Sequence, residues 1–580
     1  MRFPPLALIA VCTTLAPLPR AQDGAADPLS LIPKQALLVA WADGPAALRD
    51  AFAGTRLADM VAGPEITGLL EPILEEFRAG AGASLQGTGV DADALEELVA
   101  GYSGRMALGM GLDRDVLEQG GPLGDLEPED LRLWIAVVAA SDGETDFTEL
   151  SEAILEAVEQ QGELELFDAD AAGRTLRAAH LRRAQITLPF VHDGHLMLVM
   201  APNLDDALAT VLLGQESMAD AAIELPEGNL GAWFDGGTFG QLITQAMRDE
   251  LGDVGDQLAT GFGLPALRGL TMTIAPTGPH VALRARIGLD GDDAGFFNLF
   301  TAVSDSPPDL LEITPVQRDV WSVTKMNLEA LYDVIASIAD TLADETGMPS
   351  SALEQMFEDN FRVRLREDLV QHFGDELVSV GAGGMPSGDE EDELEAMGAQ
   401  MNGVFYGIEL ADAAAFDASF EKLIRSRGLH AARKTEDYRG YKVRRITLLA
   451  MPVFYAVTDR LFGLGVGQLG AQELRAVLDE TRDRADGKPA PPLPEAVTER
   501  LEGVEPGWQG IGASDLVAIA GSFSQGMGEV MRESGVADRD LQMLHTVLST
   551  ARQLAQRYDL RTIASVSRVD SNGLLIETIW

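Results

Sequence analysis

The strongest constraint on the fold is an order of elements that occurs twice along the chain. In residues 401–470 an apolar strand-like run ends at Asp412, and an amphipathic helix, a Tyr/Arg-rich strand and a hairpin centred on residues 458–460 follow. The same order occurs earlier, in residues 131–202. Hairpins and adjacent strands alternating with helices indicate strand pairing that is antiparallel or mixed. We therefore predict an internally duplicated chain of the α+β class, with antiparallel or mixed sheets and helices on one face.

A smaller unit follows each large one, which gives the plan large, small, large, small. Residues 268–278 and 280–290 read as two strands around a Thr-Gly-Pro turn, and a similar pair near the C-terminus surrounds an Asn-Gly turn signal. A proline-rich stretch at 486–494 reads as an extended linker. The predicted divisions are a signal peptide at 1–21, a large unit at 22–220, a small unit at 221–312, a second large unit at 313–485, and a linker with a second small unit at 486–580.

Strand-like runs end six times in Asp or Asn immediately before an amphipathic helix. A side-chain oxygen at this place accepts a hydrogen bond from the free N–H groups of the first helical turn. We therefore interpret these residues as helix caps rather than as catalytic acids. They are Asp43, Asp146, Asp235, Asn327, Asp412 and Asp515.

The first 21 residues have the pattern of an export signal. Arg2 precedes a short apolar run at 6–15, and Ala21 offers a cleavage point. The run is too short to span a bilayer. Cys12 is the chain's single cysteine, and Val11 stands before it where lipoprotein signals carry a small residue, which disfavours lipidation. We expect a periplasmic or extracellular protein without a transmembrane segment or thiol in its mature chain, which excludes disulfides and cysteine chemistry.

The charge balance is strongly acidic, with 92 acidic and 43 basic residues and a formal net charge of −49. Such a field repels nucleic acid and anionic lipid, so we expect no nucleic-acid partner. Against this background one segment is rich in basic residues. These side chains either pair with local carboxylates or form a candidate anion-binding site. They are Arg433, Lys434, Arg439, Lys442, Arg444 and Arg445.

Two histidines, His192 and His195, flank an Asp-Gly dipeptide. Two imidazoles this close could bind zinc with a third ligand from elsewhere. Asp-Gly is also a leading hairpin turn, across which the two histidines would face each other. The second copy carries Thr458 and Leu461 at these places, so we favour the hairpin and predict no metal site.

Two further motifs match catalytic or cofactor signatures in spacing only. Residues 465–470 read GVGQLG, the dinucleotide fingerprint, but the preceding strand is the second arm of a hairpin rather than the start of a βαβ unit. Ser322 and Lys325 have the S-x-x-K spacing of serine acylases, but they stand in an alternating strand instead of at a helix start. We predict no cofactor and assign no catalytic residue.

Residues 32–49, 102–110 and 373–380 combine a proline before a strand, a strand–Asp–helix step and an aromatic residue before Gly and a strand. In these features the chain resembles a family of exported bacterial proteins known only as domains of unknown function. The resemblance implies no active site. We therefore expect a secreted or periplasmic acidic protein with a non-enzymatic binding or envelope-structural role and a ligand or envelope-protein partner. The alternative is a hydrolase or metal-dependent enzyme whose residues a single sequence does not reveal.

Overall fold

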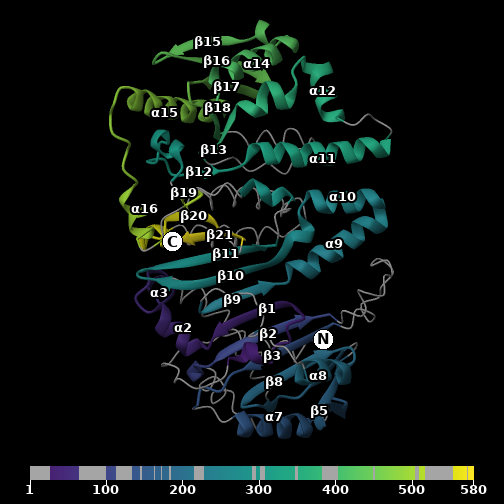
Figure 1. Ribbon diagram of the computed structural model, residues 1–580. Helices are drawn as coiled ribbons and strands as arrows, with labels where there is room; N and C mark the ends of the chain where they lie inside the picture. The colour runs from purple at the N-terminus through teal and green to yellow at the C-terminus, as the bar shows by residue number, and fades with distance from the viewer. Residues whose placement is uncertain are drawn as a thin grey trace, which may run out of the picture. The chain divides into compact units, whose positions relative to one another are not determined.

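The computed structural model describes most of the chain (Figure 1). The described residues are 27–64, 100–112, 133–143, 147–161, 164–171, 173–181, 184–213, 218, 228–290, 295–300, 307–346, 351–381, 403–448, 451–502, 504, 508–515, 553–570 and 573–580. The predicted signal at 1–21 therefore lies outside them. The chain forms two compact units: unit 1 comprises Met1–Asp249 and Arg268–Ile287, and unit 2 comprises Glu250–Leu267 and Gly288–Trp580.

Unit 1 contains eleven described strands, wholly or for most of their length. They are β1 (Ala36–Asp43), β2 (Arg105–Gly111), β3 (Trp134–Ala139), β4 (Leu166–Ala171), β5 (Arg174–Leu181), β6 (Ala184–Thr187), β7 (Phe190–His192), β8 (His195–Ala201), β9 (Leu230–Phe234), β10 (Leu267–Thr277) and β11 (His280–Leu289). Its described helices are η1 (Pro28–Leu31), α2 (Pro45–Phe52), α3 (Arg56–Val61), α7 (Phe147–Gln161), α8 (Leu204–Leu213) and most of α9 (Gly236–Leu251).

The sheet of unit 1 is antiparallel throughout its described pairs. Its strands follow the order β10–β9–β1–β2–β3–β8, after which β8 pairs with both β6 and β7, and β5 lies between β6 and β4. Strand side chains alternate between two faces, so one face collects buried residues such as Val39, Val199 and Trp233. Leu204 and Leu208 of α8 pack against that face.

Unit 2 contains the remaining described strands. They are β12 (Trp321–Lys325), β13 (Phe373–Val380), β14 (Phe405–Leu410), β15 (Lys434–Tyr438), β16 (Tyr441–Leu448), β17 (Met451–Val457), β18 (Leu461–Val466), β19 (Gly510–Asp515), β20 (Thr562–Asp570) and β21 (Gly573–Ile579). Its described helices are α10 (Asp253–Gly261), η4 (Leu264–Ala266), η5 (Gly295–Phe300), η6 (Asp309–Ile313), α11 (Leu328–Thr346), α12 (Ala352–Phe361), η7 (Leu365–Leu369), η8 (Val370–His372), α14 (Ala413–Ser426), η9 (Leu429–Ala431), α15 (Gly467–Ala485) and α16 (Glu495–Arg500).

The sheet of unit 2 has the order β21–β20–β19–β12–β13–β14–β18–β17–β16–β15, again antiparallel in every described pair. Position by position, β10 and β9 correspond to β20 and β19, β1 to β12, β2 to β13, β3 to β14 and β8 to β18. The antiparallel α+β prediction is confirmed, and the matched strand orders support the predicted duplication. Strands β9 and β19, which belong to the predicted small units, continue the sheets of the large units. The predicted boundaries between large and small units therefore stay predictions.

Helices pack on both faces of the unit 2 sheet rather than on one. The two helices concerned, α14 and α15, are labelled near β15–β18 in Figure 1. Phe405 and Phe454 point to the face that Leu474 of α15 covers. Their neighbours in sequence point to the opposite face, where Tyr455 packs with Phe416 of α14. The expectation of a single helical face is corrected for this unit, because its strands are apolar on both sides.

Three of the predicted caps are present. Asp235 accepts from the Thr238 N–H at 3.0 Å, Asn327 from the Ala330 N–H at 3.0 Å and Asp412 from the Ala415 N–H at 3.0 Å. Asp146 and the segment that follows Asp515 lie outside the described residues; the Asp515 carboxylate accepts from Arg561.

The cap prediction for Asp43 was wrong. Gly44 is the N-cap of α2, and the Asp43 carboxylate instead joins two neighbouring strands of the sheet. Within the described part of the chain, no helix has the length and apolar character needed to cross a membrane.

Candidate functional site

An irregularity in the pairing of β13 with β14 creates a distinctive site in unit 2. Phe373 pairs with Leu410, and the next pair is Leu377 with Ile408. Three residues of β13 therefore stand opposite a single residue of β14, Glu409. Such a β-bulge redirects side chains that regular alternation would send to different faces.

The bulge gathers three carboxyl groups, those of Asp375, Glu376 and Glu409, with oxygens that all lie within 4.8 Å of one another. Lys325 of the adjacent strand β12 adds an ammonium group, whose Nζ lies 3.8 Å from Glu376 Oε1. Glu376 is 3% exposed and Lys325 is 5% exposed. Charged residues are rarely buried this deeply unless they are paired, so this pair is an unusual feature of the sheet.

Glu376 also caps a short helix. Its two carboxylate oxygens accept hydrogen bonds from the N–H groups of Asp309 at 2.7 Å and Leu310 at 2.6 Å, at the start of η6. Helix N-termini leave such donors without intrahelical partners, and a carboxylate satisfies them. Burial raises the pKa of Glu376, while these two N–H groups and Lys325 act in the opposite direction.

Glu409 is the most strongly perturbed carboxyl of the group. Burial first, then the negative charges of Glu376 and Asp375 and the hydrogen bond that protonated Glu409 donates to the Asp375 carboxylate, together raise the pKa of Glu409 to about 7. A carboxyl that holds its proton near neutral pH could serve as a general acid. Three carboxylates could also hold a hard cation, but the Lys325 ammonium and the bonds that Glu376 already makes oppose this.

The corresponding place in unit 1 carries an ion pair of opposite polarity. In unit 2 Lys325 of β12 stands opposite Glu376 of β13, whereas in unit 1 Asp43 of β1 stands opposite Arg105 of β2. Arg105 Nε donates to Asp43 Oδ1 at 2.8 Å. Arg105 also lies 3.6 Å from Asp27, which caps η1 by accepting from Leu29 N–H at 3.1 Å. Each unit thus joins a cross-strand pair to a capped 3-10 helix.

An amide side chain accompanies the pair in both units. The backbone N–H of Asp43 donates to Asn229 O, and that of Lys325 donates to Gln509 O, each at 2.8 Å. Asn229 Nδ2 then donates to Asp43 Oδ2 at 2.8 Å, and Gln509 Nε2 donates to the Lys325 carbonyl oxygen at 3.2 Å. This repeated set of bonds identifies a structural junction at the end of the first strand of each sheet.

Two residues of the basic cluster form ion pairs with one helix. Arg433 pairs with Glu421, and Arg444 makes two bonds to Asp417, of 2.9 and 3.2 Å. Both carboxylates belong to α14. These contacts are the local pairing that the sequence offered as one alternative.

The other basic residues do not converge with that pair. Arg439 reaches Asp479 of α15, on the opposite face of the sheet, at 2.9 Å. Lys434 stands opposite Arg445 in the β15–β16 register, whereas Lys442 stands opposite Asp437. The Arg445 guanidinium lies 5.6 Å from the centre of the Phe454 ring. Anion binding by this segment stays a prediction, and the six side chains do not line one pocket.

The two histidines face each other across the predicted hairpin. His192 pairs with His195, and the central residues Asp193 and Gly194 have φ values of 49° and 79°, which suits an Asp-Gly turn. His195 Nδ1 lies 2.9 Å from the Asp193 carbonyl oxygen, and His192 Nδ1 lies 2.9 Å from Arg174 Nη1. Burial lowers the pKa of His192, against the influence of the Asp193 carboxylate. The hairpin is confirmed, whereas the absence of metal stays a prediction.

The glycines of GVGQLG have a packing role. The strand before them, β18, pairs with both β17 and β14, so it is a hairpin arm as predicted. A Cβ atom on Gly465 would lie 2.2 Å from the carbonyl oxygen of Gly470, so the close turn from β18 into α15 requires glycine. Ser322 bonds to Ser379, 2.8 Å between hydroxyl oxygens, on the sheet face opposite to Lys325.

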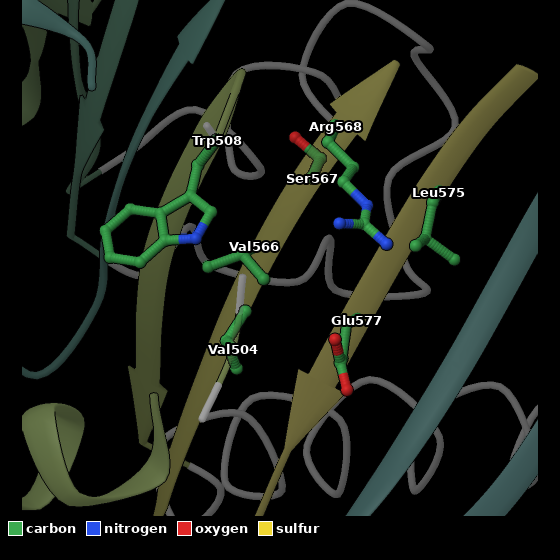
Figure 2. A pocket seen from close by; sticks show the side chains of 7 residues that line it. All are labelled: Val504, Trp508, Val566, Ser567, Arg568, Leu575 and Glu577. Atoms are coloured by element: carbon green, nitrogen blue, oxygen red, sulfur yellow. The ribbon is translucent and has the colours of Figure 1, made fainter. Parts of the chain in front are cut away.

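A small hollow lies in unit 2 beside β20 and β21 (Figure 2). Figure 2 shows the Trp508 indole on one side of Val566, with Arg568 on the other side and Glu577 on the adjacent strand. The cavity volume of this hollow is about 10 Å³. A cavity needs roughly 10–15 Å³ to hold one water molecule, so this hollow offers no room for a ligand.

The comparisons with known proteins add no assignment. No protein-family model, curated protein or solved structure significantly matches the chain. The clues that could have revealed the acidic site come from the chain's own sequence. Lys325 alternates with buried Trp321 and Val323, and Glu409 interrupts an apolar strand, so an inward-facing charge was visible in both strands.

Proposed function

We propose that the chain is an exported, non-enzymatic α+β protein with a binding or envelope-structural role. The N-terminal signal pattern and the resemblance to exported domains of unknown function support export. The observation that carries the non-enzymatic part is the junction repeated at the end of β1 and β12. Its charges have opposite signs in the two units, yet in both they hold a strand pair beside a capped 3-10 helix.

This repetition favours a structural role for the acidic cluster. A catalytic acid needs a particular group at a particular place, whereas an ion pair between strands functions with either polarity. Both carboxylate oxygens of Glu376 accept hydrogen bonds from the backbone of η6, which limits their availability to a substrate. The net charge of −49 further favours neutral or cationic ligands over nucleic acid.

Export is tested by producing the full chain in a bacterium and separating the periplasm and medium from the cytosol. We expect the protein outside the cytosol, with an intact mass that corresponds to a chain starting at Gln22. A cytosolic protein that retains residues 1–21 would contradict the proposal.

The enzyme alternative is tested with generic ester, phosphomonoester, glycoside and peptide substrates, with and without added magnesium, calcium or zinc. The three carboxyl groups of the bulge are the observation that favours this alternative. We expect no turnover above that of the buffer. Turnover by the wild type that a folded Glu409→Gln variant loses, while the variant Glu358→Gln at an exposed site retains it, would replace the proposal with a hydrolase or metal-dependent enzyme.

A further inference from the structure

The β13 bulge holds the Glu409 carboxyl directly against the backbone. A Cβ atom on Gly374 would lie 2.4 Å from Glu409 Oε2, so only glycine leaves room for the carboxyl at this place. On the other side of the bulge, Glu376 is fixed by Lys325 and by two N–H groups of η6. The half-buried carboxyl of Glu409 thus lies against a bulge that also anchors a helix.

Within the described residues, the nearby cations pair with carboxylates other than Glu409. Lys325 is already shared with Glu376, and Arg460 Nη1 lies 3.9 Å from Glu312 of η6. On α15, Glu473 pairs with Arg318 at 2.8 Å. The titratable and charged groups on the described elements and turns around Glu409 include Lys325, His372, Asp375, Glu376, Asp309, Glu312, Asp412, Asp459, Arg460 and Glu473.

We propose that this junction is a proton-linked latch, in which protonated Glu409 closes the bulge and deprotonated Glu409 loosens it through repulsion from Asp375 and Glu376. With its proton, Glu409 can share a hydrogen bond with the Asp375 side chain. Without it, three carboxylates lie within 4.8 Å of one another, and the Lys325 ammonium lies beside one of them, Glu376. Because Glu376 both belongs to the bulge and caps η6, loosening the bulge also weakens the attachment of η6.

The direction of the pH effect follows from the raised pKa of Glu409, about 7 against an ordinary value of 4.5. Below the ordinary value both the folded and the unfolded chain hold the proton, so the full stability is present. Between these values the folded state keeps a proton that the unfolded state has lost, and stability falls as the pH rises. Above about 7 both states are ionised, and the loss is complete. Glu376, whose pKa is also raised by burial, acts in the same direction.

The test compares the wild type with Glu409→Gln, a neutral side chain of the same shape, in urea unfolding between about pH 5 and pH 8. Relative to Glu409→Gln, we expect the folding equilibrium constant of the wild type to fall at least about tenfold over this range. The control is Glu358→Gln, which removes an exposed glutamate from the same unit and should keep the wild-type slope.

Hydrogen exchange locates the effect. After correction for the intrinsic rate, peptides covering β13, β14 and η6 should lose protection at high pH in the wild type and keep it in Glu409→Gln. Peptides covering β1 and β2 should not differ between the two proteins. Equal pH slopes in both proteins, or a loss of protection in the wild type that spares β13 and η6, would overturn the proposal.

A second variant protects the test from a folding failure of Glu409→Gln. Asp375→Asn removes one neighbouring negative charge and leaves Glu409 in place. The pH midpoint of the protection change in β13 should then move downward. A midpoint that does not move would show that Glu409 is not the group that titrates in this junction.

Discussion

Unit 1 and unit 2 have the same strand order but opposite charges at the same junction. Asp43 precedes its helix and faces Arg105, whereas Lys325 faces Glu376. The difference follows from where each 3-10 helix finds its cap. η1 is capped locally by Asp27, which leaves the neighbouring strand free to carry a cation, whereas η6 takes its cap from Glu376 of the sheet itself. Both units therefore carry an ion pair at this place, but the strand order does not determine which strand carries the positive residue.

The two pairs also differ in exposure. The side chains of Arg105 and Asp43 are 34% and 16% exposed, and those of Lys325 and Glu376 are 6% and 4% exposed. A buried pair contributes little net stability when intact, but an unpaired buried charge is costly. Equivalent substitutions in the two units should therefore have unequal effects.

The largest effect is expected from Glu376→Gln, which leaves the Lys325 ammonium buried without its carboxylate. We expect a loss of about 3–5 kcal/mol in the free energy of unfolding. The matched change in unit 1, Asp43→Asn, should cost about 1 kcal/mol or less, because water can reach Arg105. Urea unfolding, with exchange of β12 and β1 peptides to locate each loss, provides the measurement.

The double variant Lys325→Met/Glu376→Gln sharpens this comparison. It removes the buried Lys325 ammonium and retains a side-chain oxygen near η6, so most of the lost free energy of unfolding should be recovered. A double variant as unstable as Glu376→Gln alone would show that the buried charge is not the source of the difference between the units.

The next largest effect concerns the helix caps. Asp412→Ala should cost about 1 kcal/mol and speed the exchange of the Ala415 amide, because that N–H loses its acceptor. Asp43→Ala should leave the first turn of α2 unchanged, since its carboxylate bonds to Arg105 and Asn229 instead. Faster exchange in α2 after the Asp43 change would restore the cap interpretation for Asp43.

The smallest effect is expected from salt, which should act on both units. Sodium chloride from about 0.01 to 1 M shortens the Debye length from about 30 to 3 Å and weakens the repulsion within a chain of net charge −49. We expect the Tm to rise by about 2–4 °C, which corresponds to about 1 kcal/mol. Sulfate is avoided because it also strengthens hydrophobic burial. A flat or falling Tm would mean that the acidic side chains are too widely spaced or too well paired.

Local signals in the sequence predicted local structure well. The Asp-Gly turn between His192 and His195 and the caps at Asp235 and Asp412 depend on residues only a few positions apart, and the structure contains all of them. The cap prediction for Asp43 failed because an Asp between a strand and a helix can either cap the helix or pair with a neighbouring strand. The choice depended on Arg105, a residue on another strand.

The acidic junction could be predicted only in part. The inward charges of Lys325 and Glu409 follow from strand alternation. The bulge that brings Asp375 and Glu376 to Glu409 does not, because it depends on the register of two strands separated by a long connection. The second helical face of unit 2 was missed for a similar reason, since apolar residues on both sides of a strand do not identify the helix that covers each side.

The place of β1 and β12 within their sheets has a consequence for the order of folding. Each is the first strand of its unit, yet each pairs on one side with a strand near the end of that unit: β1 with β9, and β12 with β19. The β1–β2 and β12–β13 pairs already close across the connections 44–104 and 326–372, and the other edge of each first strand stays open until a still more distant segment arrives. Such high contact order slows folding and prolongs the interval in which these strand edges are open.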